Sequence, residues 1–395
     1  TPGYAAFVSH ARPALRVADC ALVVVDAVHG IEVQTEKTWQ YANEFLLPRF
    51  MVINKIDKEH ADFGHALETA TTSFARSIVP FSLPIGNEAN FKGVVDVVHQ
   101  KAYSYDENGK AKEIPIPEEG RDIFDRTRER LIEIVAESDD ALMEKYFADG
   151  TLPEEDIYPN LAKAIASSKL CPVYAVSASN LVGLQLLLDH IVEFAPNPAT
   201  HEAEYGFANS DLSGDRISRK YSNDEPFSAY VFRTIADPFA GRINVMKIVS
   251  GKVASDANVQ NTSRDSVERL GALHLIAGKT LEKVDSAQTG DIIAVVKLKD
   301  TQTGDTLSDK AKQIVYPKVK YPEAAISFAI EPRSRADEEK ISVALHKVLE
   351  EDPSLGFERD PQTKEFILSG SGQLHIETVV DKLNKRFHVE VTLHP

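Results

Sequence analysis

Two loops in the first half of the chain carry residue types that could read the edge of a purine base. The segment Asn54-Lys55-Ile56-Asp57 directly follows the apolar run Phe50–Ile53. The Asp57 carboxylate can accept two hydrogen bonds from the N1–H and N2 amino groups of guanine. Adenine presents an acceptor where guanine has N1–H, so a bound adenine would leave the buried carboxylate unpaired. We expect Asn54 to brace the neighbouring loops and the Lys55 stem to cover one face of the base.

The second loop, Ser177-Ala178-Ser179, follows the apolar run Val173–Val176. The backbone N–H of Ala178 can donate to guanine O6, whereas adenine carries a donor at that position. Either loop alone could be an ordinary surface turn. Two such loops after two strands of a parallel sheet would meet at the same edge, where open α/β sheets bind ligands. The pair therefore predicts a guanine-specific site.

A third segment, Thr1-Pro2-Gly3, begins the chain. In nucleotide switches, a loop of this type places the N–H of its glycine near the γ-phosphate. Glycine permits that close approach of the backbone because it has no side chain. An arbitrary Pro-Gly turn is the simpler interpretation, and only the two downstream loops argue against it.

The first half of the chain alternates apolar strands with helical patterns, which is typical of a parallel α/β sheet. The chain is expected to form strands at Ala21–Asp26, Phe50–Asn54, Ser77–Leu83 and Val173–Val176, and helices at Val33–Phe45, Phe63–Ser77 and Leu184–Phe194. Residues 1–200 are therefore predicted to form an α/β domain built on a parallel sheet.

Residues 85–170 interrupt this alternation of strands and helices and are predicted to form an inserted α+β subdomain. A hairpin-like piece turns at Asp106-Glu107-Asn108-Gly109, and one long amphipathic helix with Phe124, Leu131, Val135, Leu142 and Tyr146 along one side follows it. Residues 113–160 contain 15 acidic and five basic residues. This run is either a solvated helical face or a docking surface for a basic partner.

The second half of the chain changes character. Residues 201–225 are polar and are predicted to be a linker, and residues 226–316 contain short β-rich runs between turn residues, which indicates a β-barrel. Residues 321–395 follow the order strand, helix, strand, strand, helix, strand, which is the ferredoxin-like pattern. The expected fold is therefore a multidomain one.

The composition excludes several other classes of protein. The net charge of −16 argues against non-specific binding of nucleic acid, and no apolar run is long enough to span a membrane. Cys20 and Cys171 lie in apolar surroundings and are interpreted as buried thiols of a cytoplasmic protein.

These segments resemble the later signature motifs of translational GTPases: Thr1-Pro2-Gly3, Val24-Val25-Asp26-Ala27, Asn54-Lys55-Ile56-Asp57 and Ser177-Ala178-Ser179. Their wide separation is similar to that in elongation factor G, whose GTPase domain holds an inserted subdomain at this place. The resemblance continues through these segments of the later domains: Asp237-Pro238-Phe239-Ala240-Gly241-Arg242, Glu331-Pro332-Arg333 and Gly370-Ser371-Gly372-Gln373-Leu374-His375-Ile376-Glu377. It covers essentially the whole chain and implies that residues 1–200 are an N-terminally truncated GTPase domain of the P-loop type.

The resemblance implies a factor that binds GTP and GDP and acts on the ribosome, contacting ribosomal RNA and the flexible stalk protein. It also implies that the phosphate-binding loop precedes Thr1 and that further domains follow Pro395. The chain as given is thus expected to be a fragment that does not hydrolyse GTP, with Mg²⁺ bound only in the intact protein.

Tyr4 departs from the family pattern, which has histidine after Pro-Gly to position the attacking water. A phenol offers no imidazole lone pair. Tyr4 is therefore the candidate catalytic position, and it resembles a group of G-like bacterial paralogues. Three alternatives remain open at this stage: a ribosome-binding paralogue that uses nucleotide as a switch with little hydrolysis, another translational GTPase, and an unrelated ATPase.

Overall fold

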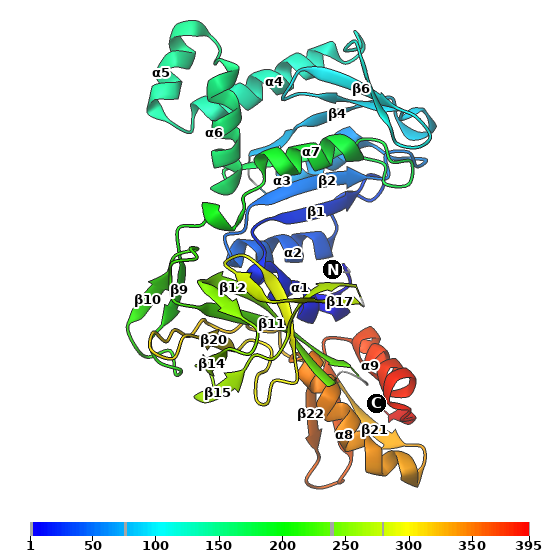
Figure 1. Ribbon diagram of the computed structural model, residues 1–395. Helices are drawn as coiled ribbons and strands as arrows, with labels where there is room; N and C mark the ends of the chain where they lie inside the picture. Colours follow the sequence, from blue (N-terminus) through cyan, green and yellow to red (C-terminus); the bar gives the residue numbers. More distant parts are fainter. Residues whose placement is uncertain (1–2, 75–76, 238–240, 279, 395) are drawn as a thin grey trace. The chain divides into compact units, whose positions relative to one another are not determined.

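A computed structural model describes residues 3–74, 77–237, 241–278 and 280–394. The chain divides into two compact units, which Figure 1 draws in sequence colours. One unit is Ala18–Thr200, and the other combines Thr1–Val17 with His201–Pro395.

The unit Ala18–Thr200 is built on a four-stranded parallel sheet with the strand order β1-β2-β8-β3. Its strands are β1 (Ala21–Asp26), β2 (Arg49–Asn54), β8 (Leu170–Ala175) and β3 (Ser77–Pro80). The two central strands are almost completely buried, as expected for a parallel sheet that is covered on both faces. The predicted α/β class of this unit is confirmed.

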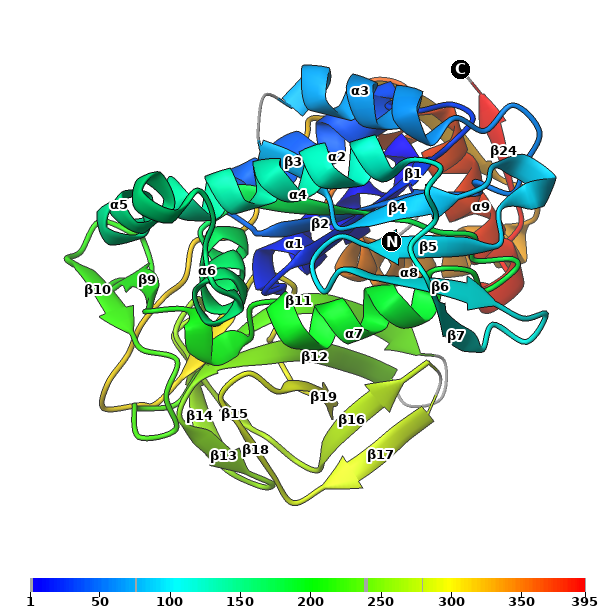
Figure 2. The same cartoon turned by 90° about the horizontal axis from the view of Figure 1, so that it is seen from above.

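Helices cover both faces of the parallel sheet, as Figure 2 shows from above. These helices are α2 (Val33–Glu44), α3 (Phe63–Phe74), α6 (Glu154–Ala166) and α7 (Leu184–Phe194). Side chains of β2 alternate between the faces: Met51 and Ile53 pack with residues of α2 and α3, whereas Phe50 and Val52 pack with residues of α6 and α7. Because the four strands run parallel, their carboxyl ends lie at the same edge of the sheet.

The insert contains an antiparallel sheet with the order β4-β5-β6-β7 and two further helices. The elements are β4 (Ser82–Ile85), the 3₁₀ turn η2 (Glu88–Asn90), β5 (Gly93–Asp96), β6 (Lys101–Tyr105), β7 (Ala111–Ile114), α4 (Arg121–Ala136) and α5 (Asp140–Asp149). The predicted strand Ser77–Leu83 is wrong as a single element, because β3 and β4 belong to different sheets. The predicted single long helix is also wrong, because Asp139 caps a new helix by accepting from the Ala141 N–H.

The second unit begins with the 3₁₀ turn η1 (Ala5–Phe7) and helix α1 (Val8–Val17). Its β-rich part is an antiparallel eight-stranded sheet with the order β15-β14-β20-β11-β12-β19-β16-β17, accompanied by the pair β13-β18. The strands are β11 (Ser228–Asp237), β12 (Gly241–Ser250), β13 (Lys252–Ala254), β14 (Asn258–Asn261), β15 (Ser266–Arg269), β16 (Leu273–Ala277), β17 (Thr280–Val284), β18 (Ser286–Gln288), β19 (Ile292–Val296) and β20 (Thr306–Ser308). The β-rich class of this part is confirmed.

The segment predicted as a linker carries structure of its own. After the 3₁₀ turn η3 (Pro198–Thr200), β9 (Glu204–Phe207) and β10 (Arg216–Arg219) form an antiparallel pair. Phe207 also bridges to Val315, next to the end of the β-rich part. The sequence did not predict this pair because both strands are short and many of their side chains are polar and face solvent.

The last part of the chain has the predicted ferredoxin-like order. Its elements are β21 (Ile326–Pro332), α8 (Arg335–Glu351), β22 (Gly356–Arg359), β23 (Phe366–Gly370), α9 (Gln373–Phe387) and β24 (Val391–His394). The strand order β22-β23-β21-β24 and the antiparallel pairings complete this topology. Among the helices that the structure describes, none is long and apolar enough to cross a membrane.

Candidate functional site

The two base-reading loops predicted from sequence leave neighbouring strands at the same edge of the parallel sheet. β2 lies between β1 and β8, with Asp26 opposite Asn54 and Ile53 opposite Ala175. The loops that follow these strand ends therefore emerge side by side. The topology of the sheet brings together residues that are more than a hundred positions apart in the sequence.

Asn54 joins the two loops directly. Its side-chain Oδ1 accepts a hydrogen bond of 3.0 Å from the backbone N–H of Ala178. Its backbone carbonyl accepts a hydrogen bond of 2.9 Å from the N–H of Ala27, in the loop that follows β1. One residue thus fixes the spacing of the loops after β1, β2 and β8.

The Asp57 side chain is only 7% exposed and lies at the junction with the second loop. Lys58 Nζ lies 3.1 Å from its Oδ2, whereas Oδ1 has no hydrogen-bond partner among the described residues. Burial raises the pKa of Asp57, but the hydroxyl of Ser177 and the ammonium of Lys58 outweigh burial and hold the pKa below its usual value. The result is an ionised carboxylate with one buried oxygen that accepts no hydrogen bond from the described residues.

Lys55 adopts a left-handed backbone conformation with φ +66° and turns its side chain across to β1. Its Nζ lies 2.7 Å from Asp26 Oδ2, while Asp26 Oδ1 accepts from the Val28 N–H at 2.8 Å. Burial raises the pKa of Asp26, but these partners outweigh burial and lower it, and Asp26 in turn raises the pKa of Lys55. The pair holds the stem of Lys55 over the strand ends.

The second loop is a tight, internally bonded turn. Ser177 is fully buried, and its backbone exchanges hydrogen bonds of 3.0 and 3.1 Å with Val182. The Ser177 hydroxyl accepts from the N–H of Asn180 at 3.2 Å, and the tip residues Ala178 and Ser179 are exposed. The loop therefore lies exposed at the rim of the sheet, with the N–H groups of Ala178 and Asn180 bonded to Asn54 and Ser177.

Gly3 and Tyr4, the predicted phosphate-sensing and water-positioning residues, belong to the other compact unit. Both are exposed, and the Tyr4 side chain is 68% exposed. The carbonyl of Tyr4 accepts from the N–H of Phe7 and so begins η1. Thr1 and Pro2 of the same motif lie outside the described residues, as do Pro238, Phe239 and Ala240 of the β-rich motif.

The structure adds two residues that the sequence did not single out as site residues. Asp26 forms the partner of Lys55, and the sequence signal was a buried strand that ends in an acid. Gly183 closes the second loop with φ +78°, and an added Cβ there would lie 2.4 Å from the carbonyl oxygen of Ala175. The sequence feature that could have identified Gly183 is its position just before an apolar helical pattern.

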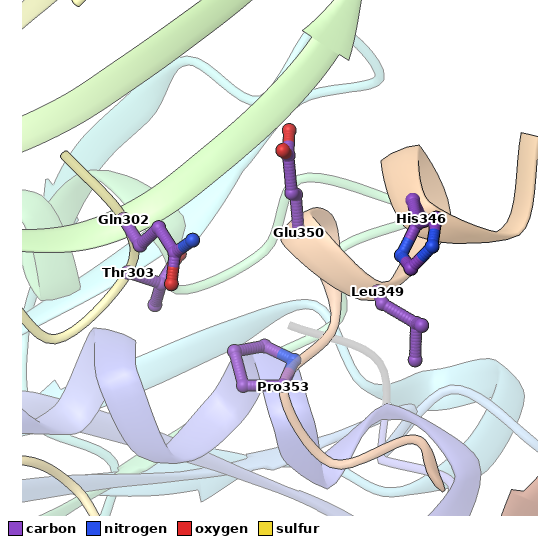
Figure 3. A pocket seen from close by; sticks show the side chains of 6 residues that line it. All are labelled: Gln302, Thr303, His346, Leu349, Glu350 and Pro353. Carbon is purple, nitrogen blue, oxygen red and sulfur yellow. The ribbon is translucent and has the colours of Figure 1, made fainter. Parts of the chain in front are cut away.

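A pocket of about 400 Å³ lies in the second unit. Figure 3 shows its lining residues: Gln302, Thr303, His346, Leu349, Glu350 and Pro353. Glu350 is engaged by Arg242, whose Nε lies 3.1 Å from Glu350 Oε2. The pocket has none of the base-reading groups of the strand-end loops, and we assign it no role in nucleotide recognition.

Family comparisons cover almost the whole chain. The model of the elongation factor Tu GTP binding domain matches residues 1–197, that of elongation factor G domain 2 matches residues 226–310, and that of elongation factor G domain III matches residues 321–395. The chain is 39% identical over 393 residues to proteins named elongation factor G from Thermotoga maritima and Thermotoga petrophila. These matches include 99% of this chain and 56% of each relative.

A solved structure of a protein from Thermus thermophilus shares the fold, with a TM-score of 0.87 and 32% sequence identity. The likeness covers 100% of this chain and 56% of that one, so the chain spans about half the length of the relatives it matches. The matched domains occur in the order predicted from the sequence. The chain therefore belongs to the elongation factor G family of translational GTPases.

Proposed function

We propose that the protein to which this chain belongs binds GTP and GDP through the loops after β2 and β8 and acts on the ribosome as a translocation-type elongation factor. The observation that carries the proposal is the ionised, buried Asp57 carboxylate with an available oxygen, next to the loop of Ala178. Guanine is the purine that offers two adjacent donors to such a carboxylate. With guanine bound, the Ala178 N–H would donate to O6. Asn54 Oδ1 would then either share this N–H with O6 or lose its hydrogen bond to it.

The remaining parts of the nucleotide would be held elsewhere. Gly3 would sense the γ-phosphate. Asp26, the nearest carboxylate on β1, is committed to Lys55 and the Val28 N–H and does not suit a Mg²⁺ ion. We therefore assign no Mg²⁺ ligand to the described residues, and the metal would be bound in the intact protein by other groups.

The ribosomal partners follow from the family. A cytoplasmic factor of this kind would contact ribosomal RNA and the stalk protein. The acidic residues of α5 and α6 form the surface of this chain most suited to a basic patch on the stalk, because each of these helices carries three acidic residues and one basic residue.

Exchange of Asp57 for asparagine tests the base-reading role in the full-length protein. The amide of D57N presents a donor toward C2, where guanine has an amino group and xanthine has an oxygen. We expect affinity for GDP to fall by about 100-fold or more and affinity for xanthosine diphosphate to rise, as measured by displacement of a fluorescent nucleotide.

Asp62 supplies a matched control, because it is an exposed carboxylate just beyond the same loop that accepts from the His65 N–H. D62N should keep the guanine preference of the parent. Equal competition by ATP and GTP in the parent protein, or an unchanged base preference in D57N, would rule out the guanine-reading role.

Tyr4 favours a second candidate function, a ribosome-binding paralogue that uses nucleotide as a switch with little hydrolysis. Its exposed phenol cannot accept a proton from water as an imidazole can. A single-turnover GTP assay with the full-length protein on ribosomes separates the two functions. Stoichiometric GTP cleavage on ribosomes supports the elongation factor, and binding without cleavage supports the switch.

A further inference from the structure

A cluster of two imidazoles and one carboxylate lies away from the base-reading loops, where the insert meets α7. Asp96 ends β5, His99 follows it within the same turn, and His190 comes from the middle of α7. Asp96 and His190 are each 1% exposed, and the side chain of His99 is 27% exposed. Figure 2 shows α7 running beside the inserted sheet that carries β5.

Three donor atoms of this cluster converge on one point. Asp96 Oδ2 lies 2.9 Å from His99 Nδ1 and 3.4 Å from His190 Nε2, and the two ring nitrogens are 3.3 Å apart. A tetrahedral zinc ion with bonds of about 2.0–2.1 Å separates its ligand atoms by about 3.3–3.4 Å. The three atoms therefore already form a triangle close to one face of a zinc coordination shell.

The atoms that would face away from an ion also have suitable partners. His99 Nε2 lies 3.3 Å from Glu193 Oε1, and His190 Nδ1 lies 3.2 Å from the hydroxyl of Tyr174. Metal-bound imidazoles characteristically donate their second N–H to such oxygen atoms, which fixes the ring and its tautomer. Asp96 Oδ1 is held by the Val98 N–H at 2.8 Å, so Oδ2 alone is directed at the histidines.

A network of hydrogen bonds alone satisfies the cluster less well. If each imidazole donates to Asp96 Oδ2, two N–H groups whose nitrogens are 3.3 Å apart point at the same oxygen and repel each other. If only one imidazole donates, the lone pair of the other ring nitrogen faces the same carboxylate oxygen, at 3.4 Å for His190 or 2.9 Å for His99. Phe81 and Phe194 surround His190 and keep water from separating the two rings. A cation at the centre of the triangle removes this conflict, because both nitrogens then present lone pairs to it.

We propose that Asp96, His99 and His190 bind a zinc ion that joins the inserted subdomain to α7. The fourth coordination position would be taken by water from the side of His99, the most exposed of the three. The role is structural, because α7 directly follows the loop of Ser177 and a fixed α7 holds that loop in place. The site does not depend on the proposed nucleotide-reading role of Asp57.

Zinc titration of the purified chain tests the proposal after treatment with a chelator and its removal. We expect binding of one zinc ion per chain by calorimetry and by elemental analysis, together with a higher melting temperature. Cobalt as a spectroscopic probe should give the visible absorption bands of a low-coordinate site with nitrogen and oxygen ligands.

Three variants identify the ligands. D96N keeps the Oδ1 acceptor for the Val98 N–H but loses the anionic ligand, and H99Q removes a partly exposed ring; each should weaken zinc binding by about 100-fold or more. E193Q alters only the outer partner of His99 and should weaken binding by about 10-fold. H60Q is the matched control, because His60 is 82% exposed and lies 3.8 Å from a carboxylate oxygen of Glu59. It should bind zinc as the parent does.

A loss of zinc binding in a variant can be distinguished from a loss of folding. Each variant is first shown to melt cooperatively in the presence of chelator. Absence of stoichiometric zinc binding in the parent chain would overturn the proposal and leave the cluster as a hydrogen-bond network. Undiminished binding in both D96N and H99Q would overturn it as well, and D57N should leave zinc affinity unchanged.

Discussion

Asp57 and Asp352 are both buried carboxylates with a lowered pKa, yet their partners differ. Asp352 Oδ2 accepts from the Ser9 hydroxyl and from His375 Nε2, each at 2.9 Å, and its Oδ1 accepts from Ser354. Both oxygens of this structural carboxylate are thus occupied. Asp57 keeps one buried oxygen without such a partner, which is what a ligand-binding carboxylate requires.

The fully hydrogen-bonded carboxylate of Asp352 leads to a prediction about how the free energy of unfolding depends on pH. Burial raises the pKa of Asp352, but hydrogen bonds from His375 and Ser354 outweigh burial and lower the pKa to about 2. The folded-state pKa lies below that of the unfolded chain, so the stabilisation is complete above about pH 4 and is lost as pH falls toward about 2. We expect D352N to lower the free energy of unfolding by about 2 kcal/mol at neutral pH, with the difference shrinking in that window.

Urea denaturation of parent and variant at several pH values between neutrality and the acid limit of folding measures this difference. The control is Asp381, an exposed carboxylate that pairs with Lys385 on the surface of α9. D381N should change the free energy of unfolding by less than about 0.5 kcal/mol at every pH. A D352N difference that stays constant down to about pH 3 would contradict the assignment.

Residue types predicted the base-reading loops, but they did not predict how side chains pair across loops. Asn54 and Asp57 could be proposed because each follows a strand, and strand ends converge in a parallel sheet. The pair of Asp26 and Lys55 joins residues on different strands and depends on the left-handed backbone of Lys55. The buried hydrogen bond between His375 and Asp352 likewise joins residues on different elements of the ferredoxin-like part.

At the scale of elements, the turn between β8 and α7 sets the position of the Ala178 N–H. Gly183 is the residue before α7 and has a left-handed backbone, with its Cα facing the carbonyl of Ala175. The paired backbone of Ser177 and Val182 brings the chain back against β8 at this point. The loop can close only if position 183 carries no side chain.

Substitution of Gly183 by alanine should therefore open the loop. The new Cβ would lie 2.4 Å from a backbone oxygen, and the left-handed conformation adds its own cost of about 1 kcal/mol. We expect G183A to lower the free energy of unfolding by about 2–4 kcal/mol and to weaken binding of guanine nucleotide in the full-length protein. Urea denaturation and nucleotide displacement measure the two effects.

Gly120 provides the matched control for this substitution. It also precedes a helix, α4, with a left-handed backbone of φ +86°, but a Cβ at this position meets no atom within 4 Å. G120A should cost about 1 kcal/mol and leave nucleotide affinity unchanged. If G120A and G183A have equal effects on both measurements, steric closure at Gly183 is not what positions the loop.

Periodicity predicted where most elements lie, but not where neighbouring elements separate. The apolar residues of α4 and α5 follow one helical rhythm, and only the capping bond of Asp139 shows that the chain turns between them. In α8 the cap is Ser334, which accepts from the N–H of Asp337, although aspartate is also a residue type that caps helices. A cap depends on local backbone angles, which several nearby Ser or Asp residues can equally support.

At the scale of the whole molecule, α1 connects the segment of Gly3 and Tyr4 to the later domains. Ser9 on α1 donates to Asp352 at the end of α8. At the other end of α1, Arg16 forms a 2.6 Å ion pair with Glu204, and the carbonyl of Val17 accepts from Lys247. A displacement of the segment of Gly3 and Tyr4 would therefore reach the β-rich and ferredoxin-like parts through these contacts of α1.

The proposed function gives position 4 a testable part in the ribosome-stimulated reaction of the full-length protein. Tyr4 is 68% exposed, so exchange for histidine removes little packing and supplies an imidazole that can orient and deprotonate water. We expect Y4H to raise ribosome-stimulated GTP turnover of the full-length protein by at least about tenfold, measured as phosphate release. Y4F retains the ring without the hydroxyl and should behave as the parent does. Equal turnover in Y4H and Y4F would remove position 4 from the chemistry and assign water positioning to another group.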